Sequence, residues 1–107
     1  MAYPYTNISG EASTIILDVG ASKDISSINI CNTHASCGTL VDLYVGTVSK
    51  GGTAAVSYYF LKNYFLKHGD YVSIENNFIR INNKVYGLFI KLTGINTSSP
   101  TVDVIIQ

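Results

Sequence analysis

A run of large apolar side chains from Val56 to Glu75 constrains this chain more than any other feature. Within it, Tyr58, Leu61 and Phe65 are spaced three and four residues apart, as on one face of a helix. The strand alternative needs one irregularity, because the alternation of large side chains changes phase near Lys62-Asn63. A β-bulge there would restore one inward face, since an extra residue reverses the side-chain direction. Tyr and Phe suit a pleated surface, so we predict strands.

Short segments of alternating apolar residues, separated by turn-forming residues, make up the rest of the chain. We predict strands over 14–19, 24–32, 39–45, 71–75, 78–81, 85–93 and 101–106, with turns at 68–70, 76–77 and 82–83. No segment combines helix caps with a sustained 3.6-residue period. The pattern predicts an all-β protein, a single β-sandwich of about seven to nine strands with jelly-roll or immunoglobulin-like topology.

The chain has 107 residues, which suits one domain rather than two. Residues 1–12 are polar and include Tyr3-Pro4-Tyr5, so we expect an N-terminal arm without regular structure, followed by the sandwich over 13–107. The first residues show neither the basic nor the apolar region of a signal peptide. No apolar run approaches the roughly 20 residues of a membrane-spanning helix, so we expect no membrane partner.

The inward faces of the predicted strands define an expected core. Its members are the aliphatic residues Leu17, Ile28, Ile30, Val41, Leu43, Leu61, Leu66, Val72, Ile74, Leu88, Ile90 and Val104. Ile15 and Val19 share the face of Leu17 in this scheme. Other apolar residues fall on outward positions, where a sandwich ordinarily carries polar ones: Ile16, Tyr44, Phe89 and Ile105. Either other loops or the N-terminal arm cover them, or they are scattered singly, or they form a contact face for partner subunits.

Charged residues are sparse and balanced, with seven basic and seven acidic residues. Nucleic-acid binding normally needs a basic surplus, so we expect no nucleic-acid partner. An apolar-rich chain of zero net charge tends to associate with other proteins. The chain also has eight Tyr residues, whose large area and polar tip suit interfaces. The candidate subunit-contact residues are Tyr3, Tyr5, Tyr44, Tyr59 and Phe89.

Cys31, His34 and Cys37 have the spacing C-x-x-H-x-x-C. A structural zinc site needs about four ligands, and the sequence offers no further Cys and only one further His, so we expect no metal and no cofactor. A disulfide between the two cysteines is possible across the loop. The alternative is two reduced thiols, at least one of them buried.

Few residues suit catalysis. His34, His68 and Asp70 are the acid–base groups near loops, and the sequence has no G-x-S-x-G nucleophile elbow and no phosphate-binding glycine loop. We therefore expect no enzyme. A carbohydrate-binding sandwich is the alternative from another class, with sugars stacked on tyrosines; the absence of Trp speaks against it. The tyrosines considered for that role are Tyr44, Tyr58, Tyr59 and Tyr86.

Three segments together carry a family resemblance: I-N-I-C-N-T-H (28–34) with V-D-L-Y-V (41–45), then Y-Y-F-L-K-N-Y-F-L-K-H-G-D-Y-V-S-I-E (58–75), and V-D-V-I-I (102–106). They resemble small virion structural proteins of tailed bacteriophages, particularly of marine and cyanobacterial phages. Those proteins show an I-x-I-x-N strand, a second strand, Y-L-x-K-N-x-x-I-x-x-G and a final V-D-V-I strand. The resemblance spans about residues 25 to 106. Lys67-His68 departs from it, because the relatives often have Pro before the turn.

The resemblance implies a structural part of the particle without catalysis, located in the head, the neck or the tail. Together with the neutral, Tyr-rich composition, it leads us to expect a capsid decoration (cement) protein, with a neck or tail component as the alternative. The expected partners are the major capsid protein or other virion proteins, with several copies or a homo-oligomer per particle. The expected location is the virion, assembled in the host cytoplasm.

Overall fold

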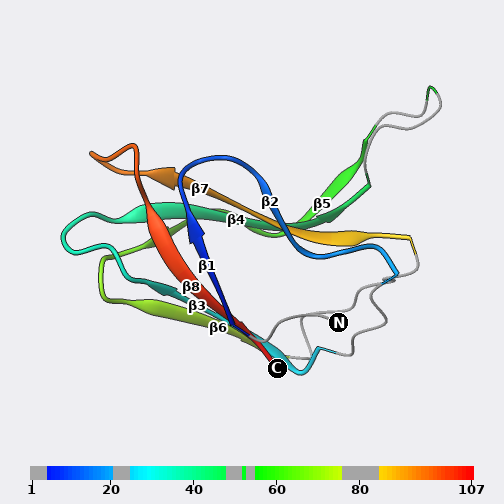
Figure 1. The fold of residues 1–107 in the computed structure, drawn as a ribbon, viewed down its shortest axis with the longest axis horizontal. Coiled ribbons are helices and arrows are strands. Elements are labelled where there is room, and N and C mark those ends of the chain that lie inside the picture. Colours follow the sequence, from blue (N-terminus) through cyan, green and yellow to red (C-terminus); the bar gives the residue numbers. More distant parts are fainter. Residues whose placement is uncertain (1–4, 21–24, 48–51, 53–54, 76–84) are drawn as a thin grey trace.

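The computed structural model describes residues 5–20, 25–47, 52, 55–75 and 85–107, which form eight strands and no helix. The strands make two four-stranded antiparallel sheets that pack face to face (Figure 1). Sheet A has the order β1 (Tyr5–Ser9), β8 (Thr101–Ile106), β3 (Ser27–Asn32) and β6 (Tyr71–Glu75). Sheet B has the order β2 (Thr14–Leu17), β7 (Gly87–Gly94), β4 (Thr39–Gly46) and β5 (Ser57–Leu66). The prediction of an all-β sandwich is confirmed.

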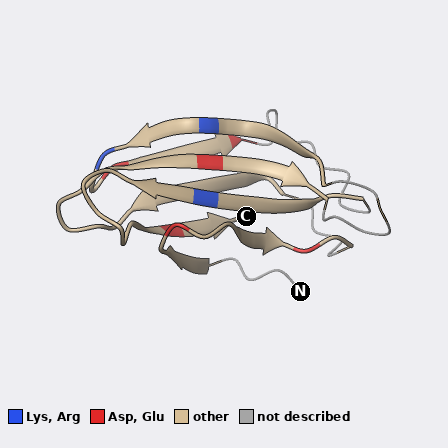
Figure 2. Ribbon diagram, turned by 90° about the horizontal axis from the view of Figure 1, so that it is seen from above, with Lys and Arg blue, Asp and Glu red and all other residues tan. Residues whose placement is uncertain are grey.

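The strand order also distinguishes the two topologies that the sequence left open. Among the described strands, each lies in a different sheet from the one that follows it, except that β4 and β5 share sheet B. β1 and β8, from opposite ends of the sequence, are neighbours. The orders β1-β8-β3-β6 and β2-β7-β4-β5 place eight strands in two sheets, as in a jelly roll. Charged residues are few along the strands, as Figure 2 shows.

The core lies between the two sheets, where the inward-facing aliphatic side chains of β3, β4, β7 and β8 pack together. Ten of the predicted core residues are buried, while Leu61 and Val72 are half-buried and pack against the others. The structure adds five buried aliphatic residues to the predicted set: Ile8, Val45, Leu92, Val102 and Ile106.

The prediction of an N-terminal arm without regular structure is wrong for residues 5–9, while residues 10–12 are irregular as predicted. Tyr5–Ser9 forms β1, which pairs along β8 from Tyr5↔Ile105 to Ser9↔Thr101. The strand contributes Ile8 to the core, opposite Val102. The sequence did not reveal it, because a single buried residue gives no periodicity and the pairing partner lies at the other end of the chain.

The predicted inward face of 14–19 is also partly wrong. The register of β2 against β7 shifts between Ile15 and Leu17, so that Ile15 lies opposite Phe89 and Leu17 opposite Leu88. Ile16 therefore packs against the core instead of facing out, and Ile15 is 42% exposed. A bulge reverses the side-chain direction, which a strict alternation cannot anticipate.

The bulge predicted near Lys62-Asn63 is confirmed, and β5 contains a second irregularity. The pairing of β5 with β4 shifts between Val41 and Leu43 and again between Leu43 and Tyr44. Asn63 takes a positive φ of 53°, and its amide donates to Asp42 Oδ1 over 2.7 Å. With both shifts, Leu61 lies opposite Leu43 on the inner face of sheet B. The helix alternative for this stretch is wrong.

The turn predicted at 68–70 is confirmed: the Asp70 amide donates to Lys67 O over 3.0 Å, and Gly69 has a φ of 76°. A positive φ at the third of four turn residues is typical of a type II turn. The strand predicted at 78–81 and the turns at 76–77 and 82–83 lie outside the described residues.

Candidate protein-contact surface

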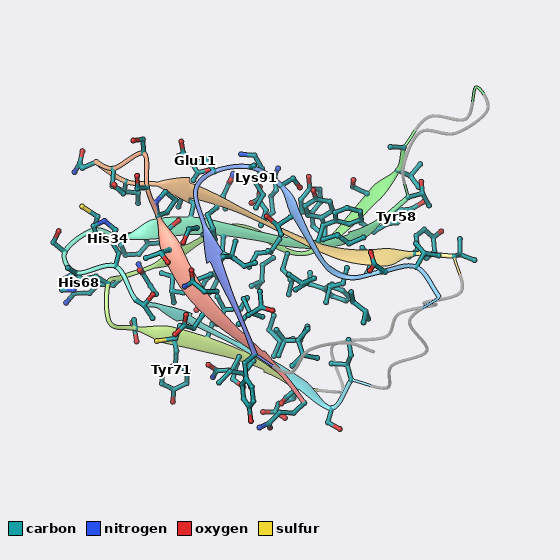
Figure 3. All side chains as sticks on the ribbon, viewed as in Figure 1. Glu11, His34, Tyr58, His68, Tyr71 and Lys91 are labelled. Atoms are coloured by element: carbon teal, nitrogen blue, oxygen red, sulfur yellow. The ribbon has the colours of Figure 1, made fainter. Side chains whose placement is uncertain are left out.

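His34 and His68 lie at the same end of the sandwich (Figure 3), where the loops after β3 and β5 meet. The imidazole of His34 holds its own loop, because Nδ1 accepts hydrogen bonds from the amides of Ser36 (3.1 Å) and Cys37 (3.0 Å). Asp70 Oδ1 accepts from the Tyr71 amide over 3.1 Å. The side chains of His34 and Asp70 therefore hold turns of the backbone at this end of the sandwich.

Cys31 and Cys37 are free thiols, and both are half-buried, so the expectation that at least one is buried is wrong. Cys37 Sγ lies 3.9 Å from Asn96 O, while Cys31 belongs to β3. Within the described part of the chain, no three His, Cys, Asp or Glu side chains gather as a metal site would require.

One feature of the outer surface is a row of four large apolar residues, one from each strand of sheet B. The register places Ile15 opposite Phe89, Phe89 opposite Tyr44, and Tyr44 opposite Tyr59. All four lie on the outer face, away from the core. Ile15 is 42% and Tyr59 46% exposed, and Tyr44 and Phe89 are half-buried. We call these residues the aromatic row.

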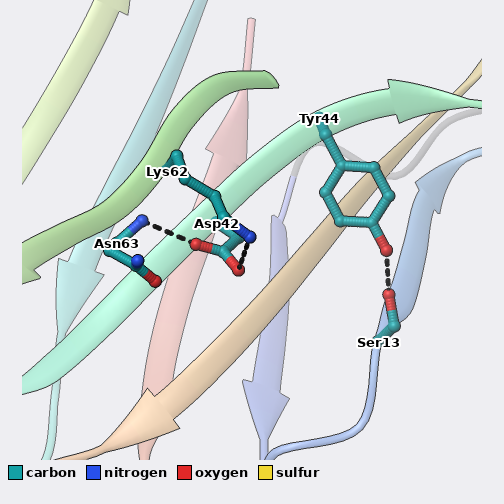
Figure 4. A network of polar contacts seen from close by, with 5 residues as sticks. All are labelled: Ser13, Asp42, Tyr44, Lys62 and Asn63. Atoms are coloured by element: carbon teal, nitrogen blue, oxygen red, sulfur yellow. Dashed lines mark hydrogen bonds and ion pairs between the residues drawn. The ribbon is translucent and has the colours of Figure 1, made fainter. Parts of the chain in front are cut away.

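The rings of the aromatic row support one another. Tyr44 and Phe89 stack with centroids 5.3 Å apart and planes inclined by 7°. Tyr44 and Tyr59 lie with centroids 5.0 Å apart at 41°. The hydroxyl of Tyr44 is hydrogen-bonded to Ser13 Oγ, just before β2 (Figure 4). Aromatic pairs of this kind contribute about 0.5–1.5 kcal/mol beyond their burial, so the row is held in place before any partner binds.

Two glycines lie side by side next to the row. Gly46 of β4 is opposite Gly87 of β7. A Cβ on Gly87 would lie 3.1 Å from Ile15 Cδ1, and one on Gly46 would lie 2.8 Å from Val56 O. A Cβ at Gly46 would therefore collide with a backbone oxygen, and one at Gly87 would require Ile15 or the Leu17 carbonyl to shift.

On the other side of the row, Asp42 is buried on the outer face between two strands that carry lysines. It lies opposite Lys91, and its Oδ2 is 3.6 Å from Lys62 Nζ. The same ammonium lies 4.4 Å from the centroid of the Tyr59 ring. Lys62 therefore covers one face of this ring through a cation–π contact while it pairs with Asp42.

The ring faces of the aromatic row are partly covered by neighbouring side chains. A sugar stacks on the open face of a ring, but Tyr44 and Phe89 turn their faces toward each other and Lys62 covers Tyr59. Ile15 and Tyr59 are the members of the row that remain exposed.

The sequence identified most of this surface. Tyr44, Tyr59 and Phe89 of the predicted contact residues come together in the row. Tyr5 is exposed on β1 of the other sheet, beside Ile105, and Tyr3 lies outside the described residues. Ile15 was missed, because its outward direction depends on the bulge in β2.

The tyrosines considered for sugar stacking do not form one surface. Tyr44 and Tyr59 belong to the row, but Tyr58 lies opposite Val45, on the inner side of sheet B. It meets Tyr86 edge to face, with centroids 6.0 Å apart and planes at 88°.

Comparison of the chain with protein-family models, curated proteins and solved structures finds no match. Among the described residues no helix is long and apolar enough to cross a membrane.

Proposed function

We propose that this protein is a non-enzymatic structural subunit of a bacteriophage particle, most simply a capsid decoration (cement) protein that binds a neighbouring virion protein through the aromatic row. The observation that carries the proposal is the row itself: three rings in mutual contact and Ile15 form one line across sheet B, with Tyr59 and Ile15 exposed. The sequence resemblance supplies the virion setting. Jelly rolls occur in viral capsid proteins, which supports the proposal by fold analogy only.

The free energy gained when a partner covers part of the row can be estimated from the exposed area of Tyr59. An aromatic side chain buries roughly 150–250 Å² when fully covered. Tyr59 is 46% exposed, so a partner can remove roughly 100 Å² of it from water. At about 25 cal/mol per Å² this contributes about 2.5 kcal/mol before association costs are subtracted.

The exposed area of the row alone is smaller than the roughly 800 Å² of surface that each partner buries in a standard interface. Modest affinity at each site suits a decoration protein, because many copies bind a symmetric shell and hold it together through repeated contacts. In the neck or the tail, the protein would bind through the same residues, with fewer copies per particle.

The test is quantitative mass spectrometry of purified particles. Hundreds of copies per particle would support the capsid position, and six or twelve copies would support the neck. Absence from intact particles, with abundant protein in the infected lysate, would refute the virion role.

A second test assigns the contact face. Particles that lack the protein are mixed with purified Tyr59→Ala or Tyr71→Ala protein, and binding is measured by co-sedimentation. Both residues are exposed tyrosines on edge strands, Tyr59 on sheet B and Tyr71 on sheet A. We expect only Tyr59→Ala to weaken binding, by about tenfold or more. Equal binding by both variants would show that the row is not the contact.

A further inference from the structure

We propose that the outer face of sheet A binds neutral oligosaccharides, with Tyr5 and Tyr71 as stacking platforms at its two edges. The proposal concerns a face other than the aromatic row and does not depend on the virion role. Tyr5 belongs to β1 and Tyr71 to β6, the two edge strands of the sheet.

The register places a strip of polar side chains between the two rings. One cross-strand line contains Asn7, Asp103, Cys31 and Tyr71, and the next contains Tyr5, Ile105, Asn29 and Ser73. These residues face away from the core, because their strand neighbours Ile8, Val104, Ile30 and Val72 point inward. We call this surface the polar face.

The rings of the polar face are open, in contrast to those of the aromatic row. Tyr5 is 73% and Tyr71 63% exposed, and neither has a ring contact within the described part of the chain. Figure 3 shows Tyr71 directed away from the sandwich. An uncovered ring face is the surface on which the C–H groups of a sugar can lie, with the hydrophobic and π contacts that aromatic rings provide.

Beside Tyr5, a hollow lies next to a network of hydrogen-bonded polar side chains. The Asn7 amide donates to Asp103 Oδ1 (2.8 Å) and to Thr101 Oγ1 (3.0 Å). Ser9 Oγ donates to Asn7 Oδ1 over 2.8 Å. The hollow measures about 270 Å³ and is lined by Tyr5, Thr6, Asn7, Asp103, Val104 and Ile105. Carboxylate, amide and hydroxyl groups next to an apolar wall match the mixed surface of a sugar.

Charge speaks against an anionic ligand. In the described strands of sheet A, the outward charged residues are Asp103 and Glu75, and no Lys or Arg is present. An anionic polymer such as a nucleic acid or an acidic polysaccharide would be repelled, since it normally binds Lys and Arg.

Geometry indicates that the ligand is extended. The rings are separated by three interstrand spacings and by one two-residue step along the strands. With strands about 4.8 Å apart and about 3.4 Å per residue, the two tyrosines are about 16 Å apart. One sugar can occupy only one platform, whereas an oligosaccharide can touch both.

The test is a titration of isotope-labelled protein, followed by NMR, with three neutral hexasaccharides: maltohexaose, cellohexaose and hexa-N-acetylchitohexaose. We expect at least one to shift amide signals of β1, β8, β3 and β6, and to bind more tightly than its monosaccharide. Tyr5→Ala and Tyr71→Ala should each weaken binding about five- to tenfold. Tyr58→Ala, which removes an exposed tyrosine of sheet B, is the matched control and should bind like the unmodified chain.

Alkylation of the two thiols provides an independent test of where the ligand binds. Cys31 lies in the polar face between Asp103 and Tyr71, and Cys37 lies in the loop after β3. A bound hexasaccharide should slow alkylation of Cys31 by iodoacetamide and leave Cys37 unchanged. Absence of binding by all three hexasaccharides, or signal shifts confined to sheet B, would overturn the proposal. Either result would leave the particle measurements on the aromatic row unaffected.

Discussion

Replacing Asn32 by Ala should destabilise the fold more than any other change of a polar side chain among the described residues. Asn32 ends β3, is 1% exposed, and satisfies all of its side-chain hydrogen-bonding groups within the protein. Its amide donates to Leu66 O (2.9 Å) and Cys37 O (3.1 Å). Its Oδ1 accepts from the His34 amide over 2.9 Å. The side chain thereby joins the loop after β3 to the end of β5, across the two sheets.

The magnitude follows from these three bonds. Asn32→Ala leaves Leu66 O, Cys37 O and the His34 amide without their hydrogen-bond partner. Each unsatisfied buried group costs about 1–3 kcal/mol, and we take about 1–2 kcal/mol per group because water can partly enter the emptied site. We therefore expect Asn32→Ala to lower the free energy of unfolding by about 3–5 kcal/mol. For a domain of this size, that corresponds to a fall in Tm of about 10–25 °C.

The assay is urea unfolding followed by far-ultraviolet circular dichroism, with Asn7→Ala as the matched control. Asn7 also makes several side-chain hydrogen bonds, including those to Thr101 Oγ1 and Asp103 Oδ1, but it is exposed. Water can replace its bonds, so we expect Asn7→Ala to cost less than about 1 kcal/mol.

Asn32→Asp keeps the size of the side chain and replaces its two N–H donors by an acceptor, so it should be about as damaging as Asn32→Ala. If Asn32→Ala cost no more than Asn7→Ala, burial would not be what makes these bonds matter, and the reasoning would be refuted.

Three further stability predictions use the same unfolding measurement. Leu88→Ala should cost about 2–5 kcal/mol, because Leu88 is fully buried between the sheets; a near-neutral result would contradict the assigned inward face of β7. Asn63→Ala should cost about 1–2 kcal/mol because φ is 53°, whereas Asn63→Gly should be close to neutral; equal effects would argue against strain at this bulge. His34→Ala should cost about 1–2 kcal/mol through the lost bonds to two amides, and the exposed His68→Ala should cost less than about 0.5 kcal/mol; a reversed order would show that Nδ1 does not hold the loop.

The fold class could be predicted because alternation is a local property of the chain. In β7, Leu88, Ile90 and Leu92 point inward whatever strand lies beside them, and the same holds for the inward residues of β3 and β8. The bulge in β5 could also be predicted, because the alternation of large side chains changes phase at Lys62-Asn63 in the sequence itself. The sequence shows no comparable change of phase at β2, where Ile15, Ile16 and Leu17 are three aliphatic residues in a row.

The arrangement of the candidate sites could not be predicted from the sequence, because it depends on which distant strands pair with each other. The outward directions of Tyr44 and Phe89 follow from local alternation, but their contact depends on the pairing of β4 with β7, whose residues are far apart in the chain. The same is true of Tyr5 and Tyr71, which belong to one surface only because β8 and β3 pair between their strands.

The sequence by itself thus determined the strands, most of the inward faces and the presence of spare aromatic side chains, since these depend on neighbours along the chain. Only the tertiary structure decided the strand order, the role of the first residues as β1, and which rings are covered or open. Register is the physical reason: it is set by backbone pairing between distant segments and by bulges, and a shift of one residue turns a side chain to the opposite face of a sheet. The stacked row on sheet B and the open tyrosines on sheet A are products of that register.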